Sequence, residues 1–193
     1  MVAYVLTLGR LVLAVCFAVC LAMWAVDGGV SSGAAIALLA MALIEEMTDV
    51  FDGWAARRFG TVSALGGILD PLVDSLSRAT IYFAMARVGW IPWAVPLVMV
   101  GRDIIVAYTR IANATVGAAT SARFSGKFKA IIQGGGIPVV IVLAMPVTRE
   151  TLAEGTVEML QFVAAGILVS VTLWSLIDYI IGALPAIRQM KNS

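Results

Sequence analysis

The chain consists of long apolar runs separated by short polar gaps. Runs of about 17–25 mostly apolar residues have the length of a helix that crosses a bilayer. Such runs cover residues 6–26, 33–57, 65–88, 91–113, 130–148 and 157–184. The gaps between them are turn-like, as at Asp27-Gly28-Gly29 and Gly89-Trp90. The pattern predicts an all-α polytopic membrane protein with six transmembrane helices, in which residues 1–193 form a single membrane domain.

The composition agrees with this prediction and excludes several functions. Of the 193 residues, 61% are hydrophobic and 13% are charged, against roughly 45–50% and 25% in soluble domains. The net charge of +1 excludes a nucleic-acid binder that works through overall charge. The sequence has no histidine, so carboxylates must perform any proton or metal chemistry.

The basic residues in and beside the gaps are distributed unevenly, and this predicts the orientation. Two of them, Arg87 and Arg149, fall on one side. Nine fall on the side of the chain ends: Arg10, Arg57, Arg58, Arg110, Arg123, Lys127, Lys129, Arg188 and Lys191. Because cytoplasmic loops are rich in Lys and Arg, we expect both termini to lie in the cytoplasm. The membrane that the protein spans is expected to be the inner, cytoplasmic membrane.

The second and third runs contain ionisable residues, which are costly inside a membrane. They are Glu45, Glu46, Asp49, Asp52, Asp70, Asp74 and Arg78. Each costs about 2.5–3.5 kcal/mol at the centre of a membrane helix, so a function is expected for them. Asp49 and Asp52 are three residues apart and Asp70 and Asp74 are four apart, which places each pair on one helix face. The roles of Glu45, Glu46, Arg78 and the later Asp178 stay open.

Two pairs of carboxylates on neighbouring helices repel each other unless cations neutralise them. Oxygen ligands without histidine or thiolate favour the hard cations Mg²⁺ or Mn²⁺, with Ca²⁺ as an alternative. Four carboxylates can hold two such ions, an arrangement that stabilises both the attacking and the leaving oxygen in phosphoryl transfer. The sequence therefore predicts a two-metal site in a polar cavity open to the cytoplasm.

Small residues lie among these aspartates at Gly53, Ala56 and Gly66. They permit either close helix packing or the approach of a ligand to the backbone. Arg57 follows Asp52 by five residues, and it could reach a phosphate near the metals or extend to the membrane surface.

Together these residues form Asp49-x2-Asp52-Gly53-x2-Ala56-Arg57-x8-Gly66-x3-Asp70-x3-Asp74. The pattern resembles the motif of the CDP-alcohol phosphotransferase family, D-x2-D-G-x2-A-R-x8-G-x3-D-x3-D, at all of its defined positions. The resemblance implies transfer of a phosphatidyl group from a CDP-linked lipid, CDP-diacylglycerol, to an alcohol, with release of CMP. It also implies a homodimer in the lipid membrane.

The resemblance further implies roles for the motif residues. Asp49, Asp52 and Asp70 would bind metal, and Asp74 would complete the metal site and act as the catalytic base. The nucleotide of the CDP-lipid would be bound by Asp52, Gly53, Ala56, Arg57 and Gly66.

A second group of charges bears on the acceptor alcohol. It comprises Arg102, Asp103, Arg110, Arg123, Lys127 and Lys129. Cytoplasmic loops are basic in any case, but Arg102 and Arg110 are eight residues apart within one predicted helix and so lie near one face. We expect Arg110 and Lys127, with Arg102 or Lys129, to bind an acceptor phosphate.

This stretch is similar to the corresponding region of bacterial phosphatidylglycerophosphate synthases, which implies glycerol 3-phosphate as the acceptor. Cardiolipin synthases share the Gly126-Lys127-x-Lys129 pattern, and for them the acceptor would be phosphatidylglycerol. Phosphatidylinositol phosphate synthases also use a phosphorylated acceptor, an inositol phosphate. A different class, an ion-coupled transporter, would also place aspartates inside a membrane, but the sequence shows no inverted repeat of the kind common in that class.

Overall fold

The protein is described by a computed structural model, which covers residues 2–26, 29–59, 64–115, 124–153 and 155–191. Side chains are described for residues 8–26, 29–48, 69–114, 124–153 and 155–184. The described part is helical and contains no strand. Its helices are α1 (Val2–Trp24), α2 (Ser32–Phe59), α3 (Ala64–Arg87), α4 (Ala94–Thr115), α5 (Phe124–Ala144), α6 (Pro146–Thr151) and α7 (Thr156–Lys191).

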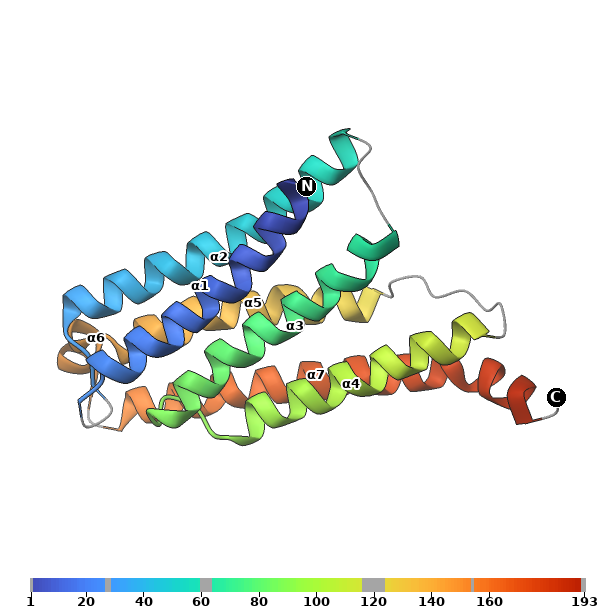
Figure 1. Ribbon diagram of the computed structural model, residues 1–193. Coiled ribbons are helices and arrows are strands. Elements are labelled where there is room, and N and C mark those ends of the chain that lie inside the picture. Colours follow the sequence, from blue (N-terminus) through green and yellow to red (C-terminus); the bar gives the residue numbers. More distant parts are fainter. Residues whose placement is uncertain (1, 27–28, 60–63, 116–123, 154, 192–193) are drawn as a thin grey trace.

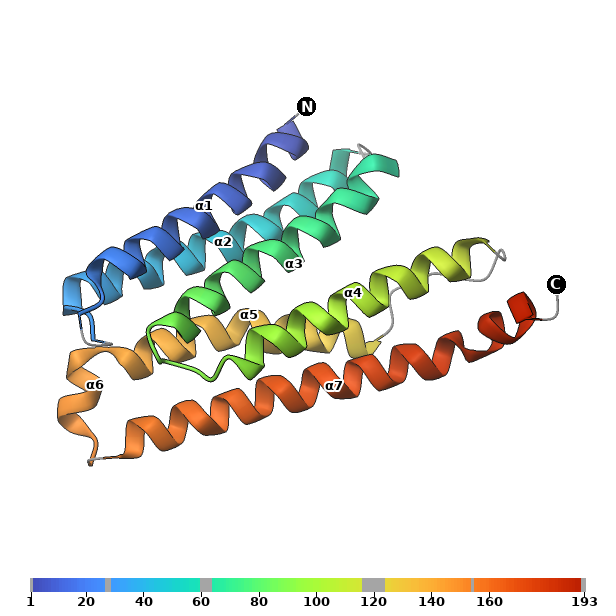
Figure 2. The same cartoon turned by 60° about the horizontal axis from the view of Figure 1, so that its bottom comes forward.

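The helices form two groups that are connected by α5 (Figures 1 and 2). Helix α1 packs against α2 and α3, and α4 packs against α7 and α3. Helix α5 contacts α2, α3 and α7. Helix α1 begins and α7 ends at the same end of the bundle, which we call the terminal end, together with the end of α2 and the starts of α3 and α5 (Figure 1). We call the opposite end the far end.

The expected all-α class is confirmed for the described residues, and each of the six apolar runs overlaps one long helix. Two differences concern the ends of the fifth run. Helix α5 begins at Phe124, earlier than residue 130, because Lys127 and Lys129 belong to the helix. The short helix α6 was not predicted, and it begins at Pro146, a residue well suited to a first helical position.

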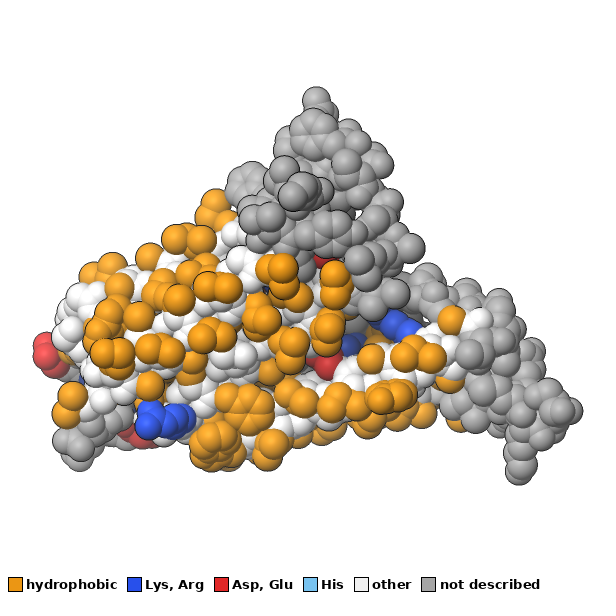
Figure 3. Space-filling view, in the orientation of Figure 1, with side chains coloured by type: hydrophobic (Ala, Val, Ile, Leu, Met, Phe, Trp, Pro, Cys, Tyr) orange, Lys and Arg blue, Asp and Glu red, His pale blue; other side chains and the backbone are white. Residues whose placement is uncertain are grey.

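Two helical segments of the described residues are long and apolar enough to cross a membrane, Phe124–Ala144 and Thr156–Leu184. A shorter apolar segment, Leu8–Trp24, lies in α1. Large apolar side chains on the bundle exterior are widely exposed, for example Phe162 at 72% and Ile131 at 70%, and they cover much of the described surface in Figure 3. Such a surface is unfavourable in water and favourable in lipid, so the fold is consistent with a membrane protein.

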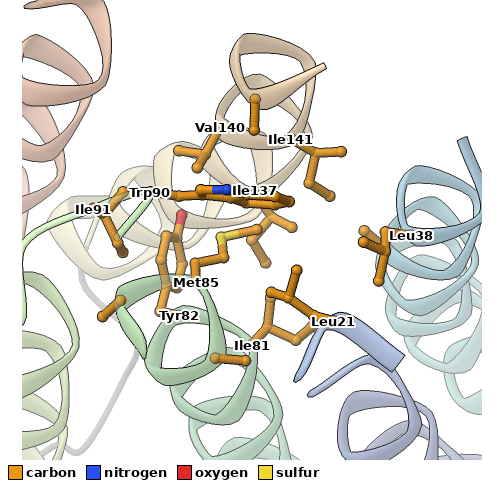
Figure 4. Close-up of a cluster of buried hydrophobic side chains, with 14 of the residues drawn as sticks. Leu21, Leu38, Ile81, Tyr82, Met85, Trp90, Ile91, Ile137, Val140 and Ile141 are labelled. Atoms are coloured by element: carbon orange, nitrogen blue, oxygen red, sulfur yellow. The ribbon is translucent and has the colours of Figure 1, made fainter. Parts of the chain in front are cut away.

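The apolar core joins both helix groups in the half of the bundle nearer the far end. Phe17 and Leu21 of α1, Tyr82 and Met85 of α3 and the Trp90 that follows α3 are almost completely buried. Figure 4 shows the Trp90 ring lying between side chains of α3 and α5. An aromatic side chain of this size buries a large apolar area against its neighbours. Packing in this cluster therefore fixes the positions of α1, α3 and α5.

Three consecutive glycines of α5 differ in the space around them, which gives a test of the packing. A Cβ atom on Gly134 would lie 2.7 Å from Glu46 Cδ, and one on Gly136 would lie 2.5 Å from the Tyr82 hydroxyl and 3.0 Å from Leu168 Cδ2. A Cβ atom on Gly135 would meet nothing within 4 Å. We expect Gly136→Ala to destabilise the protein by about 1–3 kcal/mol, and Gly134→Ala to destabilise it less, because the end of the Glu46 side chain can shift.

The matched control is Gly135→Ala, which is expected to be neutral or slightly stabilising because alanine favours a helix over glycine. Thermal unfolding of the purified proteins in detergent measures the difference. Equal melting temperatures for all three variants would contradict the close approach of α5 to α2 and α3.

Candidate active site

The motif predicted from the sequence lies on the second half of α2 and the first half of α3, and the end of α2 and the start of α3 both lie at the terminal end of the bundle (Figure 1). The backbone of both segments is helical, so each aspartate pair has the spacing that one helix face requires. The side chains of Asp49, Asp52, Gly53, Ala56, Arg57 and Gly66 lie outside the described residues. The geometry of the predicted site is therefore described for Asp70, Asp74 and the acceptor cluster.

The two described aspartates of the motif have different surroundings. Asp70 is exposed, whereas the Asp74 side chain is only 25% exposed. Asp74 lies ten residues after the start of α3, a distance of about 15 Å along the helix. Its Oδ1 atom lies 3.1 Å from Arg10 Nη2 and 3.1 Å from Arg78 Nη2, and its Oδ2 atom accepts a hydrogen bond of 3.2 Å from Arg78 Nη1.

Two glutamates of α2 complete this ionic network. Arg78 donates to both oxygens of Glu46 at 3.4 Å, while Arg10 Nη2 lies 3.8 Å from Glu45 Oε1. Glu45 is fully buried and Arg10 and Arg78 are each 3% exposed. The network therefore brings together three carboxyl groups and two guanidinium groups from α1, α2 and α3.

The donor chemistry of the motif fits a hard divalent cation, because its side chains offer carboxylate oxygens and no nitrogen or sulfur ligand. A carboxylate has about four positions for hydrogen bonds or ligands, and Asp74 makes three such contacts with the described side chains. Asp74 therefore keeps room at Oδ2. Among the residues whose side chains are described, no group of three acidic or cysteine residues is close enough to hold a metal ion. A complete site would need the side chains of α2.

The predicted acceptor cluster is drawn together by Asp103 of α4. Asp103 Oδ1 lies 2.8 Å from Arg102 Nη1 and 3.0 Å from Lys129 Nζ, and Asp103 Oδ2 accepts a hydrogen bond of 2.7 Å from Ser75. Arg102 and Lys129 are both buried. The Asp103 carboxylate thus offsets part of the charge of Arg102 and Lys129, and its contacts connect α3, α4 and α5.

Tyr179 of α7 positions the two arginines of α4. Arg110 Nη2 donates a hydrogen bond of 2.9 Å to the Tyr179 hydroxyl, and Arg102 lies 5.0 Å from the centre of the Tyr179 ring. The Nε atom of Arg110 is buried and has no hydrogen-bond partner among the described residues. Arg110 can therefore offer donors to an anion. Lys127 is exposed and makes no ion pair with another described residue.

Helix α3 lies between the two charged clusters. Asp74 contacts Arg10 on the α1 side, and the next residue, Ser75, donates to Asp103 on the α4 side. In Figure 3 acidic and basic side chains are visible where the two helix groups diverge toward the terminal end. The aspartate expected to act as a base is therefore adjacent in sequence to a residue that contacts the basic cluster.

Sequence reasoning missed several members of these clusters. Arg10 was treated as a marker of the cytoplasmic side, and Tyr179 and Ser75 were not considered. An available signal for Arg10 was its position within the first apolar run, where a charge is as costly as it is in the second and third runs. No comparable signal pointed to Tyr179, which is 69 residues from Arg110. The structure pairs Arg78 with Asp74 and Glu46, while Asp178 accepts a hydrogen bond from Ser125.

The helical bundle has an apolar surface consistent with a membrane protein and contains buried charged clusters, and comparison with known families gives its class. Residues 1–174 match the family described as CDP-alcohol phosphatidyltransferase. The chain belongs to this family and is an enzyme of phospholipid biosynthesis.

Individual relatives are similar to the chain over different lengths. A probable phosphatidylglycerophosphate synthase of Mycobacterium tuberculosis is 28% identical over 191 residues, which cover 99% of this chain and 85% of the relative. A CDP-diacylglycerol–glycerol-3-phosphate 3-phosphatidyltransferase of Yersinia pestis is 31% identical over 69% of this chain and 70% of its own length. An archaetidylinositol phosphate synthase of Pyrococcus horikoshii is 38% identical over 74 residues, which cover 38% of this chain and 39% of the relative.

Proposed function

We propose that this enzyme transfers a phosphatidyl group from CDP-diacylglycerol to glycerol 3-phosphate, giving phosphatidylglycerophosphate and CMP. The observation that carries the choice of acceptor is the basic cluster around Asp103 and Tyr179, in which Arg110 has a buried donor without a partner among the described residues. The names of the relatives from Mycobacterium tuberculosis and Yersinia pestis support the same reaction.

The donor lipid is proposed to bind between α2 and α3. Asp49, Asp52, Asp70 and Asp74 would hold two divalent ions, Mg²⁺ or Mn²⁺, which when bound would neutralise the pyrophosphate and stabilise the departing CMP. The nucleotide would lie against Asp52, Gly53, Ala56, Arg57 and Gly66, where small side chains allow close approach to the helix backbone.

The acceptor is proposed to bind on the α4 side of α3. Arg110 and Lys127, with Arg102 and Lys129, would hold the phosphate of glycerol 3-phosphate by charge-assisted hydrogen bonds. Asp74 would take the proton of the acceptor hydroxyl while the hydroxyl oxygen forms a bond to the phosphorus of the phosphatidyl group. The bond between that phosphorus and the bridging oxygen of CMP breaks in the same exchange. The hydrogen bond from Ser75, the residue after Asp74, to Asp103 of the basic cluster supports this placement of base and acceptor.

The membrane arrangement proposed for the enzyme has six transmembrane helices and both termini in the cytoplasm. Arg57 and Arg58 lie near the end of α2 and Arg188 and Lys191 near the end of α7, at the terminal end, whereas Arg87 and Arg149 lie at the far end. We propose that this terminal end faces the cytoplasm of the inner membrane and opens there as a polar cavity. The enzyme is proposed to work as a homodimer.

Release of CMP by the purified protein tests the reaction. With CDP-diacylglycerol, glycerol 3-phosphate and Mg²⁺ in detergent, we expect CMP and phosphatidylglycerophosphate in equal amounts, without a transmembrane gradient. Excess EDTA should reduce CMP release to background, and added Mg²⁺ or Mn²⁺ should restore it, because the two divalent ions would stabilise the charge that develops on the departing CMP.

The same assay compares the other acceptors. Phosphatidylglycerol as the preferred acceptor would indicate a cardiolipin synthase, and an inositol phosphate would indicate the reaction suggested by the Pyrococcus relative's name. Either result would contradict glycerol 3-phosphate. Release of CMP that EDTA leaves unchanged would contradict the metal site.

A further inference from the structure

Arg10 is a buried arginine on the first helix, and neither its position nor its partners are explained by membrane orientation. It is the single charged residue in the sequence of α1 (Val2–Trp24), and only 3% of it is exposed. Burying a guanidinium is costly unless opposite charges and hydrogen bonds surround it. Its partners therefore indicate what the residue is for.

The geometry of Arg10 favours Asp74 over Glu45. Arg10 Nη2 donates a hydrogen bond of 3.1 Å to Asp74 Oδ1, whereas its distance to Glu45 Oε1 is 3.8 Å. Both oxygens of Glu45 are buried and have no hydrogen-bond partner among the described residues. If Arg10 served only to neutralise Glu45, the closer contact would be expected there. The hydrogen bond instead joins α1 to the aspartate expected to act as the base.

Arg10 and Arg78 hold Asp74 from two directions. Arg78 lies one turn further along α3 and contacts both carboxylate oxygens, and Arg10 reaches Oδ1 from α1. If only Arg78 of the same helix held the Asp74 carboxylate, the two side chains could rotate together. A second donor from another helix fixes the plane of the carboxylate. Oδ1 then has two cationic partners and Oδ2 has one, so Oδ2 is the oxygen with room for another contact.

We propose that Arg10 is a positioning residue for the transfer reaction, which holds the Asp74 carboxylate with Oδ2 turned toward the reacting groups. This inference rests on the proposed function, because it assigns a purpose to the fixed orientation of Asp74. Residues that orient a reactive or metal-binding group typically change rate or affinity about 10–100-fold when they are replaced. Arg10 acts through Asp74 and is not itself expected to touch either substrate.

The kinetic test uses the full-length enzyme in detergent with CDP-diacylglycerol and glycerol 3-phosphate. Arg10→Gln is expected to lower kcat about 10–100-fold and to leave the KM of each substrate within about threefold. Arg10→Lys, which keeps the charge but lacks the planar pair of donors, should recover part of kcat. Arg87→Gln is the matched control, because Arg87 is exposed at the far end, and its kcat should equal that of the wild type.

A second measurement separates positioning from a general loss of stability. Gly136→Ala, which disturbs packing around Tyr82, should lower the melting temperature without a tenfold loss of kcat at a temperature where the protein is folded. A thermal double-mutant cycle checks the partner: Arg10→Gln should lower the melting temperature less in the Asp74→Asn background than in the wild type. Additive shifts would show that the two side chains do not interact, and would overturn the proposal.

The outcomes also separate this inference from the proposed function. If Asp74→Asn is inactive while Arg10→Gln keeps kcat within about threefold of the wild type, the positioning role is wrong and the function stands. If Asp74→Asn retains full turnover, the role of Asp74 as the base fails, and the positioning role fails with it. If Arg10→Gln raises the KM of both substrates by the same factor by which it lowers kcat, Arg10 supports the structure only.

Discussion

Replacing Asp70 by asparagine is expected to abolish turnover while the protein still inserts into the membrane and folds. The substitution preserves the shape of the side chain and removes its negative charge. Asp70 is exposed on α3, so its loss should cost little stability. Loss of a metal ligand should reduce kcat by more than the roughly 10–100-fold typical of its outer hydrogen-bond partners. CMP release measures turnover, and gel filtration in detergent with thermal unfolding measures folding.

The matched control for Asp70→Asn is Glu158→Gln. Glu158 is an exposed carboxylate at the far end of the bundle, where it pairs with Arg149 at 3.1 Å. An exposed ion pair contributes about 0–1 kcal/mol, so the control should be folded and fully active. Turnover by Asp70→Asn at the wild-type rate would remove the main support for a metal site built from these aspartates.

The positions of the helices could be predicted because an apolar run of membrane length has few alternatives to a helix. Each predicted run overlaps a long helix of the described structure. The apolar pattern predicts a start of the fifth helix at residue 130, after the charged Lys129, whereas α5 begins at Phe124. In the structure Asp103 lies 3.0 Å from Lys129 Nζ, and this partner makes a buried lysine acceptable within the helix.

The candidate site could be predicted only as far as spacing within one helix reveals it. Asp70 and Asp74 are one turn apart, and this follows from helix geometry alone. Contacts between helices do not follow from spacing: Arg10 is 64 residues from Asp74, and Arg110 is 69 residues from Tyr179. The ionic partners of Asp74, and the contact of Tyr179 with the two arginines of α4, could therefore be found only from the three-dimensional structure.

Under the proposed function, one helix would serve both substrates. Successive residues of α3 point in different directions, so Asp74 reaches Arg10 on α1 while Ser75 reaches Asp103 on α4. A donor lipid held between α2 and α3 and an acceptor held by α4, α5 and α7 would meet at this point. Proximity of this kind can lower the barrier by several kcal/mol, because the two reactants are brought together in a fixed geometry.

Replacing Arg110 by glutamine is expected to raise the KM of glycerol 3-phosphate about 10–100-fold, since a charge-assisted hydrogen bond contributes about 1.5–3 kcal/mol. The KM of CDP-diacylglycerol should change less than about twofold, because Arg110 lies on α4 and not between α2 and α3. Initial rates at varied concentrations of each substrate give both constants, with Arg87→Gln as the control for the loss of an arginine. Equal increases for the two substrates would show that the cluster around Tyr179 is structural. An increase confined to glycerol 3-phosphate would instead locate the acceptor phosphate at Arg110, whose buried Nε atom has no partner among the described side chains.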